Sequence, residues 1–315
     1  MRKVLLATTA LVAMGGVSAA SADISISGSA SYNYVNNSGS GTGPSAAENR
    51  DMSTNTDANI SMSSALDNGM SVSGLISLDE GGVDDHGWSL SGDFGKLAFG
   101  KASNDGFGTT ATGLTADEGI TLSATTGTAA ATPLDIPYKT VHNDFVPHSD
   151  VSITLPTVSG FTLGLGMTDG ATDAADGTQA GVTYAMNAGS MDVTIGYATA
   201  SKGSGSANDV SSAGVTVVAG DLKVVVARNE IDTYEATSVG ASYKVSDALT
   251  VQAYTGTTEK SDTAAYEVKD TGIGLTYTIT TGLTVSVTNN DFTGKGGTAG
   301  AENGTRTVVA LDATF

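Results

Sequence analysis

The sequence predicts an all-β protein, a transmembrane antiparallel up-and-down β-barrel of about 16 strands. Three observations predict it. Apolar and polar residues alternate with a period of two through most of the chain, tight turns recur at intervals of roughly 30 residues, and these turns alternate with longer polar connections. Short connections at one end and long ones at the other are typical of such a barrel, with both termini at the short-turn end.

The first 22 residues are expected to lie outside this fold. Two basic residues precede an apolar stretch at 4–17, and Ala20-Ser21-Ala22 stands directly before Asp23. This order is typical of a cleaved secretory signal peptide, and the apolar stretch is short for the alternative, a membrane anchor. We therefore assign residues 1–22 to a signal peptide and residues 23–315 to the barrel domain of an exported protein.

The alternation then locates the strands in order. In the first strand Ile24, Ile26, Ala30, Tyr32 and Tyr34 alternate with serines and an asparagine, and the second runs from residue 52 to 62. The tripeptide Asp67-Asn68-Gly69 follows and predicts a hairpin turn, because Asn-Gly readily adopts positive φ angles. Similar tight turns are predicted near Asp93, Val158, Ala188, Gly220, Asp247 and Thr281. The longer connections are predicted at residues 36–50, 79–86, 101–149, 169–178, 200–209, 228–233, 256–266 and 289–304.

Composition excludes several classes of protein. The chain has 315 residues with 39% hydrophobic and 6% aromatic residues, which is little material for a solid core of that size. The face opposite the apolar one carries mainly Ser, Thr, Gly and Asn, which fits the wall of an aqueous lumen. The absence of cysteine excludes disulfides, thiolate metal sites and thiol nucleophiles. A net charge of −19, or −21 without the two basic residues of the leader, argues against nucleic acid as a partner.

Aromatic residues and the last strand favour a membrane barrel. Ten strand aromatics share the apolar, outward parity, and Tyr254 has inward parity; the ten are Tyr32, Tyr34, Trp88, Phe99, Phe161, Tyr184, Tyr197, Tyr243, Tyr277 and Phe315. The chain ends on an aromatic residue after an alternating strand, from Thr305 to Phe315. This ending is similar to the signal that the barrel assembly machinery reads, and an ordinary terminal strand is the alternative.

The sequence resembles the trimeric general porins of Gram-negative outer membranes, particularly those of alphaproteobacteria, over essentially the whole chain after residue 22. Three segments carry the resemblance: Leu66-Asp67-Asn68-Gly69-Met70 with Gly74, Gly92-Asp93-Phe94-Gly95-Lys96-Leu97 with Gly100, and Leu155-Pro156 through Gly160-Phe161. The resemblance implies an outer-membrane location, outer-membrane lipid and lipopolysaccharide as surroundings, and a homotrimer.

The resemblance also implies that the third long connection, residues 101–149, folds into the lumen and narrows the pore. Such constrictions set acidic residues of the loop against basic residues of the facing wall. The acidic candidates are Asp105, Asp117, Glu118, Asp135 and Asp144, of which Asp117 and Glu118 are adjacent. The basic candidates are Arg50, Arg306 and Lys101, with Arg228 near a loop end; Arg306 has inward parity, whereas Arg50 shares the outward parity of Met52. This basic side is thinner than the multi-arginine wall of the family.

The charge balance predicts how the pore selects. A lumen and mouths dominated by carboxylates concentrate cations and repel anions, which predicts weak cation selectivity and passive diffusion of ions and small polar solutes. A substrate-specific sugar channel is an alternative, but it would need a ladder of inward aromatics, and Tyr254 stands alone.

Other function classes fit less well. No catalytic motif for a nucleotide, a nucleophilic serine or a phosphate occurs, and the three histidines fall in predicted loops, so an enzyme is not expected. No cofactor is expected either, apart from Ca²⁺, for which Asp79, Glu80, Asp84 and Asp85 in one loop are weak ligand candidates. A secreted β-rich adhesin or surface-layer protein is the alternative from another class, but it would lack the outward aromatics and the terminal Phe315.

Overall fold

The structure is a computed structural model that describes residues 23–40, 49–79, 82–100, 150–168, 177–202, 210–231, 234–260, 267–297 and 300–315. In these segments every regular element is a β-strand, and the sixteen strands form one sheet that closes on itself. The predicted signal peptide and the connection at 101–149 lie outside the described residues. No helix in the described part of the chain is long and apolar enough to cross a membrane.

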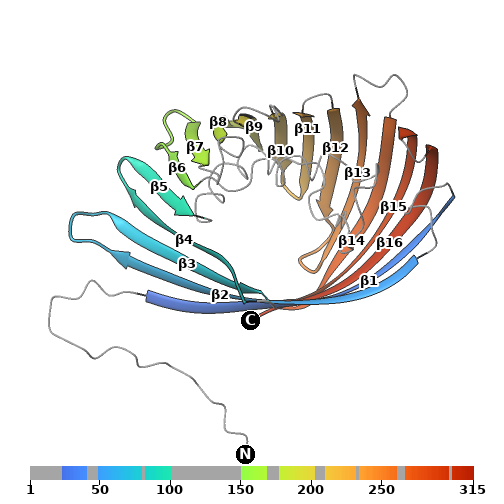
Figure 1. Cartoon of the computed structure of the whole chain (residues 1–315), viewed down its shortest axis with the longest axis horizontal. Coiled ribbons are helices and arrows are strands. Elements are labelled where there is room, and N and C mark those ends of the chain that lie inside the picture. The colour runs from blue at the N-terminus through green and yellow to red at the C-terminus, as the bar shows by residue number, and fades with distance from the viewer. Residues whose placement is uncertain are drawn as a thin grey trace, which may run out of the picture.

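The strands follow one another around the barrel in chain order, and each pairs antiparallel with its two neighbours (Figure 1). The first eight are β1 (Asp23–Ser40), β2 (Asn49–Ala65), β3 (Ser71–Asp79), β4 (Gly82–Gly92), β5 (Gly95–Gly100), β6 (Val151–Thr154), β7 (Phe161–Thr168) and β8 (Gly177–Ala188). The last eight are β9 (Met191–Lys202), β10 (Val210–Ala219), β11 (Leu222–Ile231), β12 (Tyr234–Lys244), β13 (Leu249–Lys260), β14 (Glu267–Thr280), β15 (Leu283–Gly297) and β16 (Gly300–Thr314). The predicted up-and-down barrel is confirmed.

The barrel closes between β1 and β16. Their ladder runs from the pair Ser29–Thr314 to the pair Ser40–Asn303. Beyond it, the Gly28 N–H donates to the carbonyl of Phe315 at 2.7 Å, and the Phe315 N–H donates to the carbonyl of Gly28 at 3.0 Å. A Cβ at Gly28 would stand 2.6 Å from the Phe315 ring, so the ring of the terminal residue lies against a position with no side chain.

The seven predicted tight turns each join two consecutive strands at the same end of the barrel. In the turn after β2, the Leu66 N–H donates to the Met70 carbonyl at 2.7 Å, and the Asn68 side-chain oxygen accepts from the Met70 N–H at 3.2 Å. The start of β1 and the end of β16 lie at this same end. The asymmetry between short turns and longer connections is therefore confirmed.

Several strands extend further than the sequence predicts. The connection predicted at 289–304 is mostly strand, because β15 continues to Gly297 and β16 begins at Gly300. In the same way β1 continues to Ser40 and β4 begins at Gly82. Beyond the band of apolar residues on the outward face, both faces of the sheet are polar. The apolar–polar alternation therefore disappears while the backbone hydrogen-bond ladder continues.

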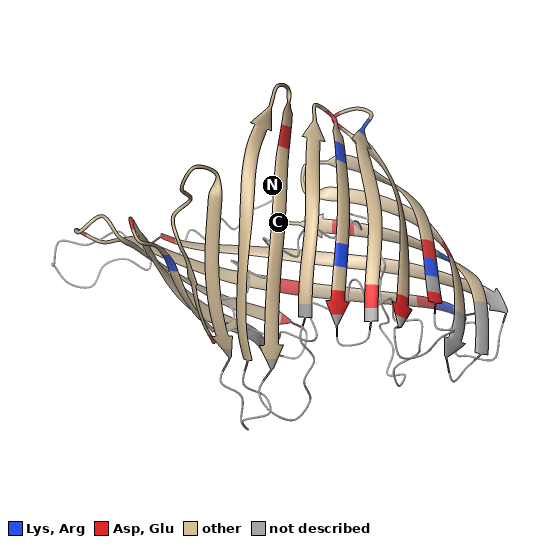
Figure 2. Cartoon of the chain, turned by 90° about the horizontal axis from the view of Figure 1, so that it is seen from above, with Lys and Arg blue, Asp and Glu red and all other residues tan. Residues whose placement is uncertain are grey.

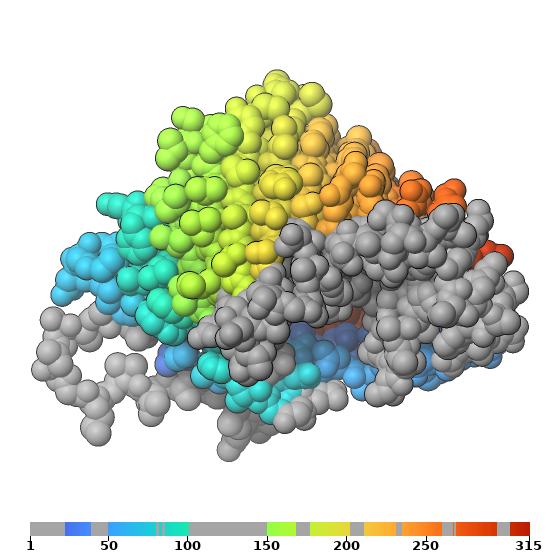
Figure 3. Space-filling model, turned by 45° about the horizontal axis from the view of Figure 1, so that its top comes forward, coloured from blue at the N-terminus to red at the C-terminus, as the bar shows by residue number. Residues whose placement is uncertain are grey.

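The outward face is apolar and the inward face is small and polar. Cross-strand aromatic pairs lie on the outward face, with ring centroids 4.3 Å apart for Trp88–Phe99 and 4.4 Å apart for Phe161–Tyr184. The outer surface of the green to orange strands, from β6 to β13, forms a continuous wall (Figure 3). Large apolar side chains are exposed on it where a soluble protein would bury them, which is the arrangement that a lipid-facing surface requires.

Candidate functional site

The lumen wall is built from inward-facing side chains that bond to one another across neighbouring strands. The hydroxyls of Ser73 on β3 and Ser89 on β4 are 2.7 Å apart, and the Ser212 hydroxyl donates to the Asn229 side-chain oxygen at 2.6 Å. Small hydroxyl and amide side chains leave space inside a barrel that is too wide to be filled by its own wall. The wall therefore suits a water-filled passage.

Larger groups gather on the inward face of β13 to β16. In one cross-strand row Tyr254 lies opposite Gly272, Gly272 opposite Asn290, and Asn290 opposite Arg306. At the next inward-facing position, two residues along each strand, Asp270 lies opposite Phe292. We call Tyr254, Asp270, Asn290, Phe292 and Arg306 the wall cluster.

The wall cluster is tightly packed. The Tyr254 hydroxyl donates to a carboxylate oxygen of Asp270, and these residues are 3% and 2% exposed. A Cβ at Gly272 would stand 2.2 Å from the Tyr254 ring and 2.6 Å from the Asn290 side-chain oxygen, so only glycine lets these two groups approach. Asn290 is 2% exposed, and neither of its amide atoms, nor Nε of Arg306, has a hydrogen-bond partner within the described structure.

The structure places the predicted basic residues on different faces. Arg306 is on the inward face of β16, as its parity predicts, and it interacts electrostatically with Asp270 and Tyr254. Arg50 lies opposite Asn36 in an uninterrupted ladder, with the outward parity of Met52, so no bulge turns it into the lumen. Lys101 lies outside the described residues.

The predicted acidic residues of the constriction all lie outside the described residues, namely Asp105, Asp117, Glu118, Asp135 and Asp144. Within the described wall, the acid that the fold brings to Arg306 is Asp270.

Three members of the wall cluster were missed by sequence reasoning. Phe292 and Asn290 fall in the segment that was predicted as a connection, so the prediction that Tyr254 is the one inward strand aromatic is wrong. Asp270 could have been found, because it alternates with Gly272 and Gly274 on the inward side of a predicted strand. The signal available in the sequence is the alternation of inward and outward positions along a strand. It shows to which face of the sheet a residue points, but not which residues of the neighbouring strands lie beside it.

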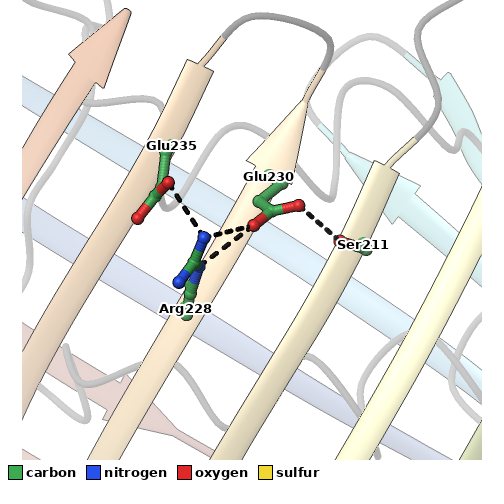
Figure 4. A network of polar contacts seen from close by, with 4 residues as sticks. All are labelled: Ser211, Arg228, Glu230 and Glu235. Atoms are coloured by element: carbon green, nitrogen blue, oxygen red, sulfur yellow. Dashed lines mark hydrogen bonds and ion pairs between the residues drawn. The ribbon is translucent and has the colours of Figure 1, made fainter. Parts of the chain in front are cut away.

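A charged network occupies the outward face at the ends of β10, β11 and β12 (Figure 4). Arg228 donates to Glu230 at 2.6 Å and to Glu235 at 2.9 Å, and the Ser211 hydroxyl is 3.5 Å from Glu230. Glu230 and Glu235 are directly opposite each other, where two like charges would repel without Arg228 between them. Arg228 is therefore committed outside the lumen.

Acidic positions continue this row along the ends of the neighbouring strands (Figure 2). Glu235 pairs in register with Glu259, and Glu259 with Glu267, which forms an ion pair of 2.6 Å with Lys269. Along β11 the outward residues change from Leu222, Val224 and Val226 to charged groups within two positions, so the row marks the edge of the apolar band.

The candidate Ca²⁺ ligands are only partly visible. Asp79 is the last residue of β3, Glu80 lies outside the described residues, and Asp84 and Asp85 fall near the start of β4. Among the residues that the structure describes, no group of three His, Asp or Glu side chains could hold a metal ion.

Solved structures share this architecture at low sequence identity. An anion-selective porin from Comamonas acidovorans matches with a TM-score of 0.64 and 14% identity over 94% of this chain and 100% of that one. The trimer form of OmpT, an outer membrane protein of Vibrio cholerae, matches with 0.61 and 14% over 93% and 99%. The outer membrane channel DcaP of Acinetobacter baumannii matches with 0.61 and 12% over 96% and 99%.

No curated protein matches the sequence. The family model of the Gram-negative porins matches residues 7–314, which is nearly the whole chain. Together with a closed sixteen-stranded barrel, a polar inner wall and an apolar outer face, this match identifies the kind of molecule. The chain belongs to the Gram-negative porin family and is an outer-membrane channel, not an enzyme.

Proposed function

We propose that the channel allows passive diffusion of ions and small polar solutes and is weakly cation-selective. The observation that carries this proposal is the charge balance, with 33 acidic against 14 basic residues. Carboxylates at the lumen and mouths raise the local concentration of cations, and salt screens this effect beyond about 8 Å at physiological ionic strength. The similar porin from Comamonas acidovorans is anion-selective, but 14% identity carries only the fold, so selectivity here depends on this chain's own charges.

We also propose that residues 101–149 fold into the lumen as the constriction. Support comes from the inward-facing wall, where Val225, Ala236 and Thr288 are each 2% exposed. A barrel of sixteen strands leaves an aqueous interior, so inward side chains would be wet unless something inside the lumen covers them. The connection between β5 and β6 is the longest between two consecutive strands, and we propose that it covers these side chains.

Reconstitution into a planar bilayer under a KCl gradient tests the selectivity. We expect a reversal potential that favours potassium, because the acidic excess attracts cations to the pore. A reversal potential that favours chloride would contradict the proposal. The same recording tests the proposed homotrimer, since three pores that insert together give conductance steps in groups of three.

The double variant Asp117→Asn/Glu118→Gln tests the inserted loop. It should lower the preference for potassium, because two carboxylates beside the permeating ions are lost. The matched control is Glu259→Gln/Glu267→Gln, which removes the same charge from a cross-strand pair on the outward face. Equal selectivity in the two double variants would place Asp117 and Glu118 outside the constriction.

We infer the partners from two parts of the barrel, its outer surface and its terminal strand. Outer-membrane lipid and lipopolysaccharide would cover the apolar band and the charged row above it. The barrel assembly machinery would read the strand that ends in Phe315. The cleaved signal peptide at residues 1–22 would direct export.

The loop acids Asp79, Glu80, Asp84 and Asp85 remain a candidate Ca²⁺ site. Paired carboxylates around two glycines offer the hard oxygen ligands that Ca²⁺ prefers. Calorimetric titration with CaCl₂ should then show binding that the variant Asp84→Asn/Asp85→Asn loses. Equal heats for both proteins would remove the site.

The other functions considered are less well supported. A closed membrane barrel of this family is not a secreted adhesin or surface-layer protein. A sugar-specific channel would need aromatic residues along the length of the pore. Tyr254 on β13 and Phe292 on β15 lie on either side of β14, only two residues apart along the strand direction. They therefore do not form such a ladder.

A further inference from the structure

We propose that Asp270 is a selectivity-determining residue of the pore, because it neutralises the positive charge that Arg306 places on the lumen wall. The proposal rests on the diffusion function of the lumen and adds a residue outside the loop at 101–149. It follows from the positions of the wall cluster, from its packing and from the charge of its two ionisable groups.

The register brings the two charges to one place on the wall. Arg306 on β16 lies opposite Asn290 on β15, and Asn290 lies opposite Gly272 on β14. Asp270 is two residues from Gly272 on the same strand, so its side chain shares the inward face. Because Gly272 has no side chain, the Tyr254 ring and the Asn290 side-chain oxygen occupy the space beside it. Asp270 accepts a hydrogen bond from Tyr254, and Arg306 lies opposite Asn290, so the two charged groups lie on either side of this packed centre, with β15 between their strands.

The carboxylate of Asp270 is held in position. Tyr254 donates its hydroxyl hydrogen to Asp270, and both residues are almost completely buried. A carboxylate that is shielded from water interacts more strongly with a neighbouring guanidinium than an exposed one does. Among the described residues, Asp270 and Tyr254 lie close enough to act on the charge of Arg306, which is itself largely shielded from water.

A neutral pair and a lone arginine affect permeating ions differently. A unit charge about 10 Å from an ion in water changes the local concentration of that ion roughly two-fold. An uncompensated Arg306 would repel cations by about this factor and attract anions by the same factor. Paired with Asp270, it contributes little net field, and the acidic excess elsewhere determines the selectivity.

The test is the ratio of potassium to chloride permeability in planar bilayers for four variants. Asp270→Asn should lower the ratio about four-fold, because a two-fold loss of cations and a two-fold gain of anions multiply, and Arg306→Gln should raise it about four-fold for the same reason. The double variant should return close to the wild-type ratio, because the two removed charges cancel. Asp270→Glu keeps the charge and should keep the ratio.

The matched control is Asp291→Asn, which removes an acid from β15 next to Asn290 but on the outward face. It should leave the ratio unchanged. The proposal is overturned if Asp270→Asn behaves like Asp291→Asn, or if the double variant keeps the full shift of either single variant. If Asp270→Asn does not fold, the comparison of Arg306→Gln with the double variant still tests the proposal. Adding Asp270→Asn to Arg306→Gln must return the permeability ratio toward the wild-type value.

Failure of the proposed cation selectivity is a separate outcome. A wild-type pore that prefers chloride would contradict the proposed function. Opposite shifts in Asp270→Asn and Arg306→Gln, measured relative to that wild type, would still support the role of Asp270.

Discussion

Replacing Gly95 with alanine is expected to destabilise the barrel by about 2–5 kcal/mol. Gly95 begins β5 with a φ of +104°, which disfavours any residue with a side chain. A Cβ there would stand 2.0 Å from the Thr154 carbonyl oxygen and 3.1 Å from the backbone of Leu155. Because the obstacle is the backbone of β6 and not a flexible side chain, the clash can be relieved only by moving the strand.

Urea unfolding of the refolded protein in detergent measures this loss. The single tryptophan, Trp88, stacks on Phe99 of β5 and therefore reports on this part of the sheet. Gly189→Ala is the matched control, since Gly189 has a φ of +69° but no neighbouring atom within 4 Å of an added Cβ. It should lose only about 1–2 kcal/mol from the backbone conformation. Equal losses in the two variants would show that the contact with β6 does not matter.

Replacing Phe315 with alanine is expected to reduce several-fold the amount of barrel in the outer membrane while leaving refolding in detergent nearly unchanged. The alanine keeps both backbone hydrogen bonds to Gly28, each of which contributes about 0.5–1.5 kcal/mol. The ring itself is 76% exposed and adds little to the finished barrel. A large loss in cells would therefore come from recognition of the terminal aromatic during assembly.

Measurement of folded protein in purified outer membranes, beside the yield of refolding in detergent, separates the two effects. Gly28→Ala pushes the ring from its place but keeps the terminal residue, so delivery to the membrane should continue. Gly74→Ala is its control, because the nearest atom to the added Cβ is the flexible Met62 methyl group at 3.3 Å and the nearest backbone atom, the Gly87 oxygen, is at 3.8 Å. Poor refolding of Phe315→Ala in detergent would mean that the terminal residue acts through closure and not through recognition.

Much of the barrel could be predicted because a β-strand repeats every two residues and tight turns have a recognisable chemistry. Asp67-Asn68-Gly69 predicts the turn after β2, and the alternation around Tyr243 and Tyr277 predicts their outward faces. The prediction fails where the pattern has no apolar component. The sequence predicts a connection at Phe292 because Asn289 to Asp291 are polar on both faces, yet the ladder with β14 and β16 continues through them.

The sequence by itself determined the strand count, the end at which the chain turns tightly, the polarity of the two faces and the inward direction of Arg306. These properties depend on local spacing along one strand. Only the tertiary structure decided which residues meet, because the register between strands and the closure of the sheet bring together positions far apart in the chain. Arg306 therefore interacts with Asp270 across β15, and Arg228 bonds to Glu235 on the outside. For both arginines the sequence indicates only the face of the sheet to which the side chain points. The residues that they contact are decided by the pairing of the strands.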